Sequence, residues 1–209
     1  MSAPPSEFDA RARTWDEDAS KRERAERVAA AIERRVPFLS GRKVLEYGAG
    51  TGLLGLALQP LVAELTLADV SGEMLAVARE KIAARGLGNV RTALLDLTAA
   101  RVPEARFDLV CTLMTLHHVP DTDAILRAFH QVLSGGGILC IADLDGEDGS
   151  FHGPGFTGHR GFDRADLGAR LERCGFRDVR FETVFEVTRE TARGTRLFPI
   201  FLATASRGP

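Results

Sequence analysis

The residues best suited to chemistry lie in a glycine-rich stretch, Val44-Leu-Glu-Tyr-Gly-Ala-Gly-Thr-Gly52. Glycines let the backbone turn tightly and approach a ligand closely. A G-x-G-x-x-G spacing occurs at Gly50, Gly52 and Gly55, but it is shifted from the end of the preceding apolar run, so it is weak support for a dinucleotide site. Glu46 precedes these glycines. Its carboxylate would repel a pyrophosphate and attract a ligand with an ammonium group.

Two further acidic residues follow later apolar runs. Asp69 comes 19 residues after Gly50, at a place where a carboxylate can bind both ribose hydroxyls. Asp96 ends the next run and can accept a hydrogen bond from an adenine amino group. Together they predict a ligand that carries a nucleoside.

Histidines supply the candidate bases. His117 and His118 are adjacent, and their side chains on one helical turn would point about 100° apart. We interpret His118 as the ring that faces a substrate and as the candidate catalytic base. The glycine-rich loop 145–162 is interpreted as a lid over an acceptor pocket, with four candidate substrate-binding residues: Phe151, His152, Phe156 and His159. The alternatives are ordinary hydrogen-bonded rings and a mobile surface loop.

Short apolar runs that alternate with amphipathic stretches must position these residues. Strands are predicted over 43–47, 61–67, 90–95, 107–113, 137–142, 178–188 and 195–205. Helices are predicted to begin at a Ser20–Glu23 capping box, at Leu53, and at caps Ser71, Asp121 and Asp163, with Gly135 closing the fourth helix. This pattern predicts an α/β fold, a doubly wound Rossmann-like sheet of seven strands, with helices on both faces. The sheet is expected to be mostly parallel with one antiparallel strand, which the last hairpin places at the sheet edge.

Composition excludes several classes of protein. The 209 residues carry a formal net charge of −2, whereas sequence-independent nucleic-acid binding needs a basic face. The three cysteines show no metal-ligand spacing, so we expect no metal site and a reducing, cytoplasmic location. We find no signal-peptide apolar region and no membrane span of about 18 apolar residues, so no membrane partner is expected.

The predicted elements also suggest a domain plan. We expect residues 1–40 to form an N-terminal helical cover and residues 41–209 to form the ligand-binding domain, with the lid-like loop 145–162 inside it. This plan leaves no room for a separate substrate domain, so a small substrate is expected.

Several motifs in order resemble one family. Leu45–Gly52, Asp69–Leu75, Leu95-Asp96, Phe107–Val110 and Leu116–Val119 are similar to class I S-adenosylmethionine-dependent methyltransferases. The resemblance is nearest to the small-molecule enzymes of the ubiquinone and menaquinone biosynthesis type, and it spans roughly residues 8–205.

The resemblance implies the cofactor S-adenosylmethionine, with S-adenosylhomocysteine as product, and in-line methyl transfer to a small organic acceptor. Within it, Glu46 and the backbone of 48–50 hold the methionine end, Asp69 binds the ribose, and Trp15 covers the site. Lys21 or Arg22 would pair with the methionine carboxylate. The full set of implied cofactor-binding residues is Trp15, Glu46, Gly48, Ala49, Gly50, Asp69, Val70, Met74, Asp96, Leu97, Thr112, Met114 and His117.

Two other functions stay open from the sequence. The first is an NAD(P)-dependent oxidoreductase that uses the shifted glycine spacing, although its one tyrosine, Tyr47, has no lysine at the spacing of a Tyr-x-x-x-Lys pair. The second is a non-catalytic cofactor-binding module of the same fold. The acceptor and the atom that is methylated are not identified by the sequence.

Overall fold

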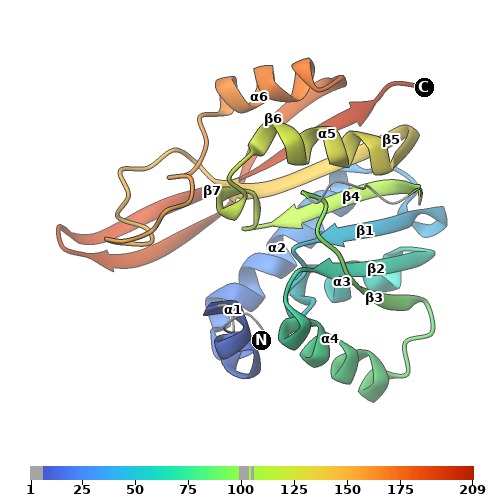
Figure 1. The fold of residues 1–209 in the computed structure, drawn as a ribbon, viewed down its shortest axis with the longest axis horizontal. Coiled ribbons are helices and arrows are strands. Elements are labelled where there is room, and N and C mark those ends of the chain that lie inside the picture. The colour runs from blue at the N-terminus through green and yellow to red at the C-terminus, as the bar shows by residue number, and fades with distance from the viewer. Residues whose placement is uncertain (1–6, 99–103, 105) are drawn as a thin grey trace, which may run out of the picture. The chain divides into compact units, whose positions relative to one another are not determined.

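A computed structural model describes residues 7–98, 104 and 106–209 (Figure 1). Its contacts divide the chain into two compact units, residues 1–96 and residues 97–209, which are described separately below. The boundary expected at residue 40 stays a prediction.

The first unit builds a three-stranded parallel sheet in the order β3-β2-β1. Tyr47 of β1 pairs with Ala68, and Asp69 of β2 pairs with Leu94 of β3, so the carboxyl ends of the three strands lie along one edge. The elements of this unit are α1 (Glu7–Arg11), η1 (Ala12–Glu17), α2 (Ala19–Arg35), η2 (Leu39–Gly41), β1 (Lys43–Tyr47), α3 (Leu53–Leu58), η3 (Gln59–Leu61), β2 (Glu64–Asp69), α4 (Gly72–Arg85) and β3 (Val90–Leu94).

The helices of this unit cover the sheet with apolar side chains. Helix α4 packs against β2 and β3, and α2 packs against α3, as can be followed in Figure 1. Strands β1 and β2 are buried almost along their whole length, as expected for parallel strands covered on both faces.

The start of α2 corrects one prediction. The cap is Asp18, whose side chain accepts a hydrogen bond from the Ser20 N–H, and the helix begins at Ala19. The Ser20–Glu23 capping box is therefore wrong, because an earlier carboxylate takes the capping position. Serine at position 71 caps α4 as predicted, accepting from the Met74 N–H.

The second unit builds four strands in the order β4-β5-β7-β6. Strands β4 and β5 are parallel, and β7 is antiparallel to both β5 and β6. The elements of this unit are β4 (Phe107–Leu113), η4 (Leu116–His118), α5 (Thr122–Val132), β5 (Leu133–Leu144), α6 (Arg164–Arg173), β6 (Phe176–Thr191) and β7 (Gly194–Arg207). The seven strands, of which one is antiparallel, confirm the predicted α/β class.

Two details of this unit differ from the predictions. The antiparallel strand β7 lies inside, between β5 and β6, and the edge strand is β6, because the hairpin turn brings the last strand back beside β5. Gly135 does not close α5, which ends at Val132. The next residue, Leu133, already pairs with Phe107, so the ladder with β4 takes up the chain directly after the helix.

The loop 145–162 lies beside the projecting β6–β7 hairpin (Figure 1). The Arg196 guanidinium on β7 donates to the Asp148 carboxylate at 2.6 Å and to the Ser150 hydroxyl. At its two ends the loop is closed by a bridge between Asp145 and Phe162. In the part of the chain that the structure describes, no helix is long and apolar enough to cross a membrane.

Candidate functional site

The glycine loop, residues 48–52, follows β1 and leads into α3. Gly48, Gly50 and Gly52 have φ values of 69°, 54° and 81°, which favour glycine. The third glycine of the shifted spacing, Gly55, has a different role: a Cβ there would lie 2.4 Å from Leu67 Cδ2 and 2.5 Å from Glu46 Oε2. Gly55 therefore lets α3 approach a buried carboxylate, which disfavours a pyrophosphate at this helix start.

Glu46 is that carboxylate. It lies near the end of β1, is 2% exposed, and accepts a hydrogen bond from the Gly55 N–H at 2.8 Å. Burial raises the pKa of Glu46 to about 8, and the nearby Asp69 carboxylate acts in the same direction, while the Gly55 N–H and the Lys81 ammonium oppose it. A buried carboxylate with so little support for its charge is a site where a bound cation would be stabilised.

Asp69 holds the next strand end to the glycine loop. Its two carboxylate oxygens accept from the Gly50 N–H at 2.7 Å and from the Ser71 N–H at 2.8 Å. Burial raises the pKa of Asp69, although these N–H donors and that of Val70 oppose the shift. The carboxylate therefore fixes the loop, and its three N–H donors leave one of its roughly four lone-pair sites for a further donor.

The N-terminal segment contacts this loop through residues that the sequence reasoning missed. Asp16 accepts from the Thr51 hydroxyl at 2.5 Å and pairs with the Lys81 ammonium, which also donates to the Thr51 carbonyl at 2.8 Å. Asp9 accepts from the Ser71 hydroxyl. These polar residues are far apart in sequence, so no local spacing indicates them.

Trp15, in the same N-terminal segment, is half-buried. The Lys21 ammonium lies 3.6 Å from the centre of its ring, and Phe8 packs edge-on at 6.0 Å. Lys21 is thus engaged with Trp15, and the Arg22 guanidinium donates to the Asp16 carbonyl. Both cations therefore already have contacts within the protein. The pairing of Lys21 or Arg22 with a methionine carboxylate stays a prediction.

The other predicted residues of the first unit lie around the same strand ends. Val70 is 61% exposed although it is apolar, Met74 is buried under the glycine loop, and Asp96 is exposed. The Met74 sulfur would lie 3.8 Å from a Cβ at Gly50. The structure therefore gathers Glu46, Gly48, Ala49, Gly50, Asp69, Val70 and Met74 at the carboxyl ends of β1 and β2.

The second unit holds the remaining predicted cofactor residues. Met114 directly follows β4 with φ 54°, an uncommon conformation for a residue with a side chain. The Thr112 hydroxyl is buried and has no hydrogen-bond partner among the described residues. Leu97, the first residue of this unit, is also buried. Their part in cofactor binding stays a prediction.

His117 is held by a buried carboxylate that the sequence did not indicate. Its Nδ1 lies 2.6 Å from an Asp143 carboxylate oxygen, and its backbone N–H donates to the other oxygen at 3.3 Å. Burial disfavours the charge on Asp143, but His117 and the Leu144 N–H outweigh it, so the pKa of Asp143 is lowered. Asp143 thus fixes the position and tautomer of the His117 ring.

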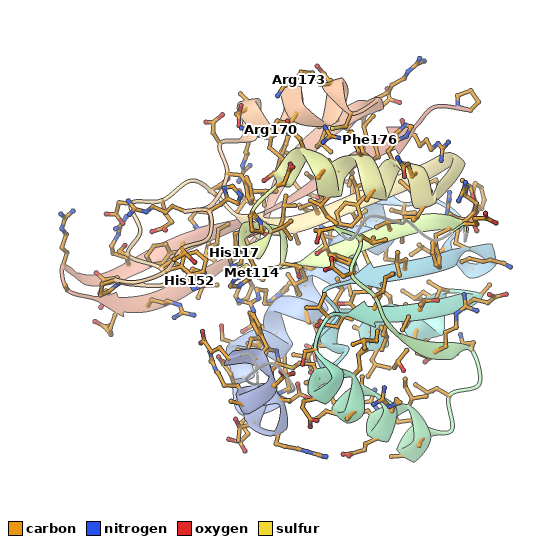
Figure 2. The ribbon with its side chains drawn as sticks, in the orientation of Figure 1. Met114, His117, His152, Arg170, Arg173 and Phe176 are labelled. Carbon is orange, nitrogen blue, oxygen red and sulfur yellow. The ribbon has the colours of Figure 1, made fainter. Side chains whose placement is uncertain are left out.

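His118 and His152 lie against this ring and form with it the histidine cluster: His117, His118 and His152. The ring centres are 4.1 Å apart for His117 and His118 and 5.0 Å apart for His117 and His152. Figure 2 labels His117 and His152, which come from η4 and from the loop 145–162. Burial, with the charges of the other two rings, lowers the pKa of His118 to about 4. This ring is neutral at pH 7 and is a weak base.

The loop residues have two kinds of contact. Phe156 stacks on His152 at 3.8 Å and lies edge-on to His118. Phe151, by contrast, is 3% exposed and packs on Phe198 of β7. His159 Nε2 lies 3.0 Å from the Val119 carbonyl. Phe151 and His159 thus make contacts that hold the loop in place. These contacts favour a structural role for the two residues, whereas the sequence predicts that they contact an acceptor.

The sequence of this chain is similar to those of known methyltransferases. Residues 44–137 match a family model described as a methyltransferase domain. The ubiquinone/menaquinone biosynthesis C-methyltransferase UbiE of Shewanella sp. (strain ANA-3) is 37% identical over 108 residues, which are 50% of this chain and 43% of that protein. The ubiquinone biosynthesis O-methyltransferase of Xanthomonas euvesicatoria pv. vesicatoria (strain 85-10) is 33% identical over 147 residues, 66% of this chain and 59% of that protein. The chain thus spans about half the length of these curated relatives.

A solved structure extends the similarity of fold to nearly the whole chain. The SAM dependent methyltransferase from Aquifex aeolicus has a TM-score of 0.70 at 21% identity and covers 95% of this chain and 97% of its own. This similarity confirms the predicted Rossmann-like fold. The match of residues 44–137 to the methyltransferase-domain model and the two curated relatives confirm the resemblance to class I S-adenosylmethionine-dependent methyltransferases that the sequence motifs indicate.

Proposed function

We propose that this chain transfers a methyl group from S-adenosylmethionine to a small organic acceptor. The observation that carries the proposal is Glu46, a carboxylate buried at the end of β1 with one hydrogen bond among the described residues and a pKa raised to about 8. Such a group fits a ligand that brings a positive charge. The ammonium of the methionine end supplies that charge, whereas a dinucleotide brings a pyrophosphate.

The remaining residues fit the other parts of the same ligand. The glycine loop offers backbone close to Glu46, and Asp69 has a lone pair left for a ribose hydroxyl. Exposed Val70 offers an apolar surface for a base, and Trp15, whose ring lies under the Lys21 ammonium, directly precedes Asp16, which bonds Thr51 of the loop. We assign the adenine to Met74, Asp96 and Leu97, and the methionine chain to Thr112, Met114 and His117.

S-adenosylmethionine supplies a methyl group on a positively charged sulfur, so the protein mainly has to align the acceptor and exclude water. A base is needed where the acceptor atom carries a proton at pH 7. We assign that role to His118, which is neutral at pH 7, and the acceptor contact to His152 and Phe156 of the loop, which acts as a lid. The relatives are named as C- and O-methyltransferases, so both acceptor atoms are to be tested. We place the enzyme in the cytoplasm.

The first test is calorimetry with S-adenosylhomocysteine, for which we expect micromolar binding. Asp69→Ala should weaken binding by about 1–3 kcal/mol, the size of a lost pair of charge-assisted hydrogen bonds. Glu73→Ala, which removes an exposed acid in the first turn of α4, is the matched control and should bind normally. A thermal shift with NADH and none with S-adenosylhomocysteine would instead support an oxidoreductase.

The second test concerns the charge of Glu46. Because Glu46 holds a proton below about pH 8, binding of an ammonium group should release it. We expect a proton release that approaches one per ligand at pH 6.5 and vanishes in Glu46→Gln, measured by calorimetry in buffers of different ionisation enthalpy. Equal proton release in both proteins would contradict the assignment of the ammonium to Glu46.

A further inference from the structure

The roles assigned to His117, His118 and His152 in methyl transfer do not require their ring nitrogens to lie close together, yet these nitrogens converge. His117 and His118 lie in η4, and His152 lies in the loop 145–162. Each side chain offers a ring nitrogen within 4.8 Å of the other two. His117 is buried, while His118 and His152 are partly exposed. The cluster is therefore assembled by the fold of the second unit alone and can be reached from solvent.

A ring nitrogen of His117 is buried without a partner among the described residues. His117 Nε2 has no hydrogen-bond partner among the described residues, and the side chain is 1% exposed. Its other nitrogen, Nδ1, is engaged with the Asp143 carboxylate at 2.6 Å. Leaving a buried polar atom unsatisfied is costly. With the proton on Nδ1, Nε2 presents a lone pair toward the other two rings.

A carboxylate behind one histidine and two further imidazoles beside it is the arrangement in which proteins bind divalent transition metals. We propose that His117, His118 and His152 bind a divalent transition metal ion, with Zn²⁺ as the representative, and that Asp143 orients His117 as a metal ligand. Three imidazoles leave one coordination position for water or for an oxygen of a ligand. A bound metal occupies the lone pair of His118, so the base role proposed above belongs to the metal-free chain.

The distances require a small movement. With Zn–N bonds of about 2.0–2.1 Å, nitrogens in a tetrahedral site lie about 3.4 Å apart, compared with at most 4.8 Å in the cluster. His152 can supply this closure because it lies in a loop, where Phe156 stacks on it at 3.8 Å and orients its ring. Metal binding should then tie the loop 145–162 to η4. The sequence predicts no metal site, because its three cysteines have no metal-ligand spacing. His152 stands far along the chain from the His117-His118 pair, so no local spacing indicates this cluster.

The test uses the untagged full chain, stripped with a chelator and titrated with Zn²⁺ alone by calorimetry. We expect one Zn²⁺ per chain. His152→Ala should weaken this binding by at least about 100-fold, and Asp143→Asn by about 10- to 100-fold, the usual cost of losing a carboxylate behind a ligand. His130→Ala is the matched control, since His130 is a histidine of the same unit whose ring packs edge-on against Phe176 of β6. It should bind Zn²⁺ like the wild type.

A second readout reports the ligand geometry and does not depend on activity. Co²⁺ in place of Zn²⁺ should give the intense visible absorption of a four-coordinate site, and this band should be absent in His152→Ala. The proposal is overturned if the stripped chain takes up no Zn²⁺, if His152→Ala binds as tightly as the wild type, or if His130→Ala loses the same affinity. Each of these outcomes leaves S-adenosylhomocysteine binding untouched, so failure here is distinct from failure of the proposed function.

Discussion

Two buried carboxylates, one in each unit, have opposite electrostatics. Glu46 is 2% exposed and Asp143 is fully buried. Glu46 accepts from one backbone N–H, and burial raises its pKa to about 8. Asp143 accepts from the Leu144 N–H and the His117 N–H and faces the His117 ring, and its pKa is lowered despite burial. Burial alone therefore does not determine the charge of a carboxylate; the donors around it do.

The contrast separates two tasks. Asp143 has its donors within the protein, so it can serve to orient His117 in the absence of any ligand. Glu46 has only one such donor among the described residues, so a cation from a bound ligand would stabilise its ionised form. A satisfied carboxylate fits a positioning role, and an unsatisfied one fits ligand binding.

The largest expected effect comes from breaking the satisfied carboxylate. Asp143→Ala leaves the His117 ring and two backbone N–H groups buried without their acceptor, so we expect the free energy of unfolding to fall by about 3–5 kcal/mol. Urea unfolding measures this. Asp143→Asn, which keeps an acceptor oxygen, should lose less, about 1–3 kcal/mol. A loss below 1 kcal/mol in Asp143→Ala would show that the pair does not hold this region together.

The unsatisfied carboxylate should behave in the opposite way. The pKa of Glu46 is about 8 in the folded chain against 4.5 as its ordinary value. Between these pH values the folded state retains a proton that the unfolded state has released, so stability falls as pH rises. Glu46→Gln removes this effect and keeps the size of the side chain.

The measurement is urea unfolding of the wild type and Glu46→Gln at pH 5, 6, 7 and 8. The variant should gain stability relative to the wild type as pH rises, by up to about 1.4 kcal/mol per pH unit. Asp143→Asn at the same pH values is the matched comparison and should show no such gain. Parallel curves for the wild type and Glu46→Gln would mean that Glu46 is ionised throughout.

Much of the fold could be predicted because its signals are local. Strands 43–47 and 107–113 and the caps Ser71, Asp121 and Asp163 are found as predicted. Each depends on an apolar run or on a side chain that bonds the backbone two or three residues later. The capping box predicted at Ser20 is wrong because two local signals compete there. Asp18, two residues earlier, takes the capping position.

The site could be predicted only in part. Asp69 follows a strand and so stands out in the sequence, whereas Asp143 lies inside an apolar run and its partner His117 is 26 residues away. Asp16 and Thr51 are 35 residues apart. Such pairs are created by the packing of distant segments, and a single sequence carries no spacing that reveals them.

A third prediction changes the one donor that supports Glu46. In Gly55→Ala the new Cβ would lie 2.5 Å from Glu46 Oε2 and 2.4 Å from Leu67 Cδ2, so α3 must shift. Overpacking of this kind costs about 1–3 kcal/mol, measurable by urea unfolding, and we also expect weaker S-adenosylhomocysteine binding. Gly72→Ala is the control, because a Cβ there meets nothing within 4 Å. Equal stability of both variants would show that the contact with Gly55 does not constrain Glu46.

The smallest expected effect concerns Lys81, whose positive charge lowers the pKa of Glu46 less than the other causes change it. Lys81→Met removes the charge and keeps the length of the side chain. Without this charge the pKa of Glu46 should rise. The stability of the wild type relative to Glu46→Gln falls with pH up to this pKa, so the pH at which the fall ends should move upward when both proteins also carry Lys81→Met. The lost ion pair with Asp16, which is partly exposed, should cost at most about 1 kcal/mol. The unfolding series has to be extended above pH 8 to detect this shift, because the pKa of Glu46 is already about 8. A downward movement would mean that Lys81 acts on Glu46 through the position of the Thr51 carbonyl, to which it donates, and that its charge is screened from the carboxylate.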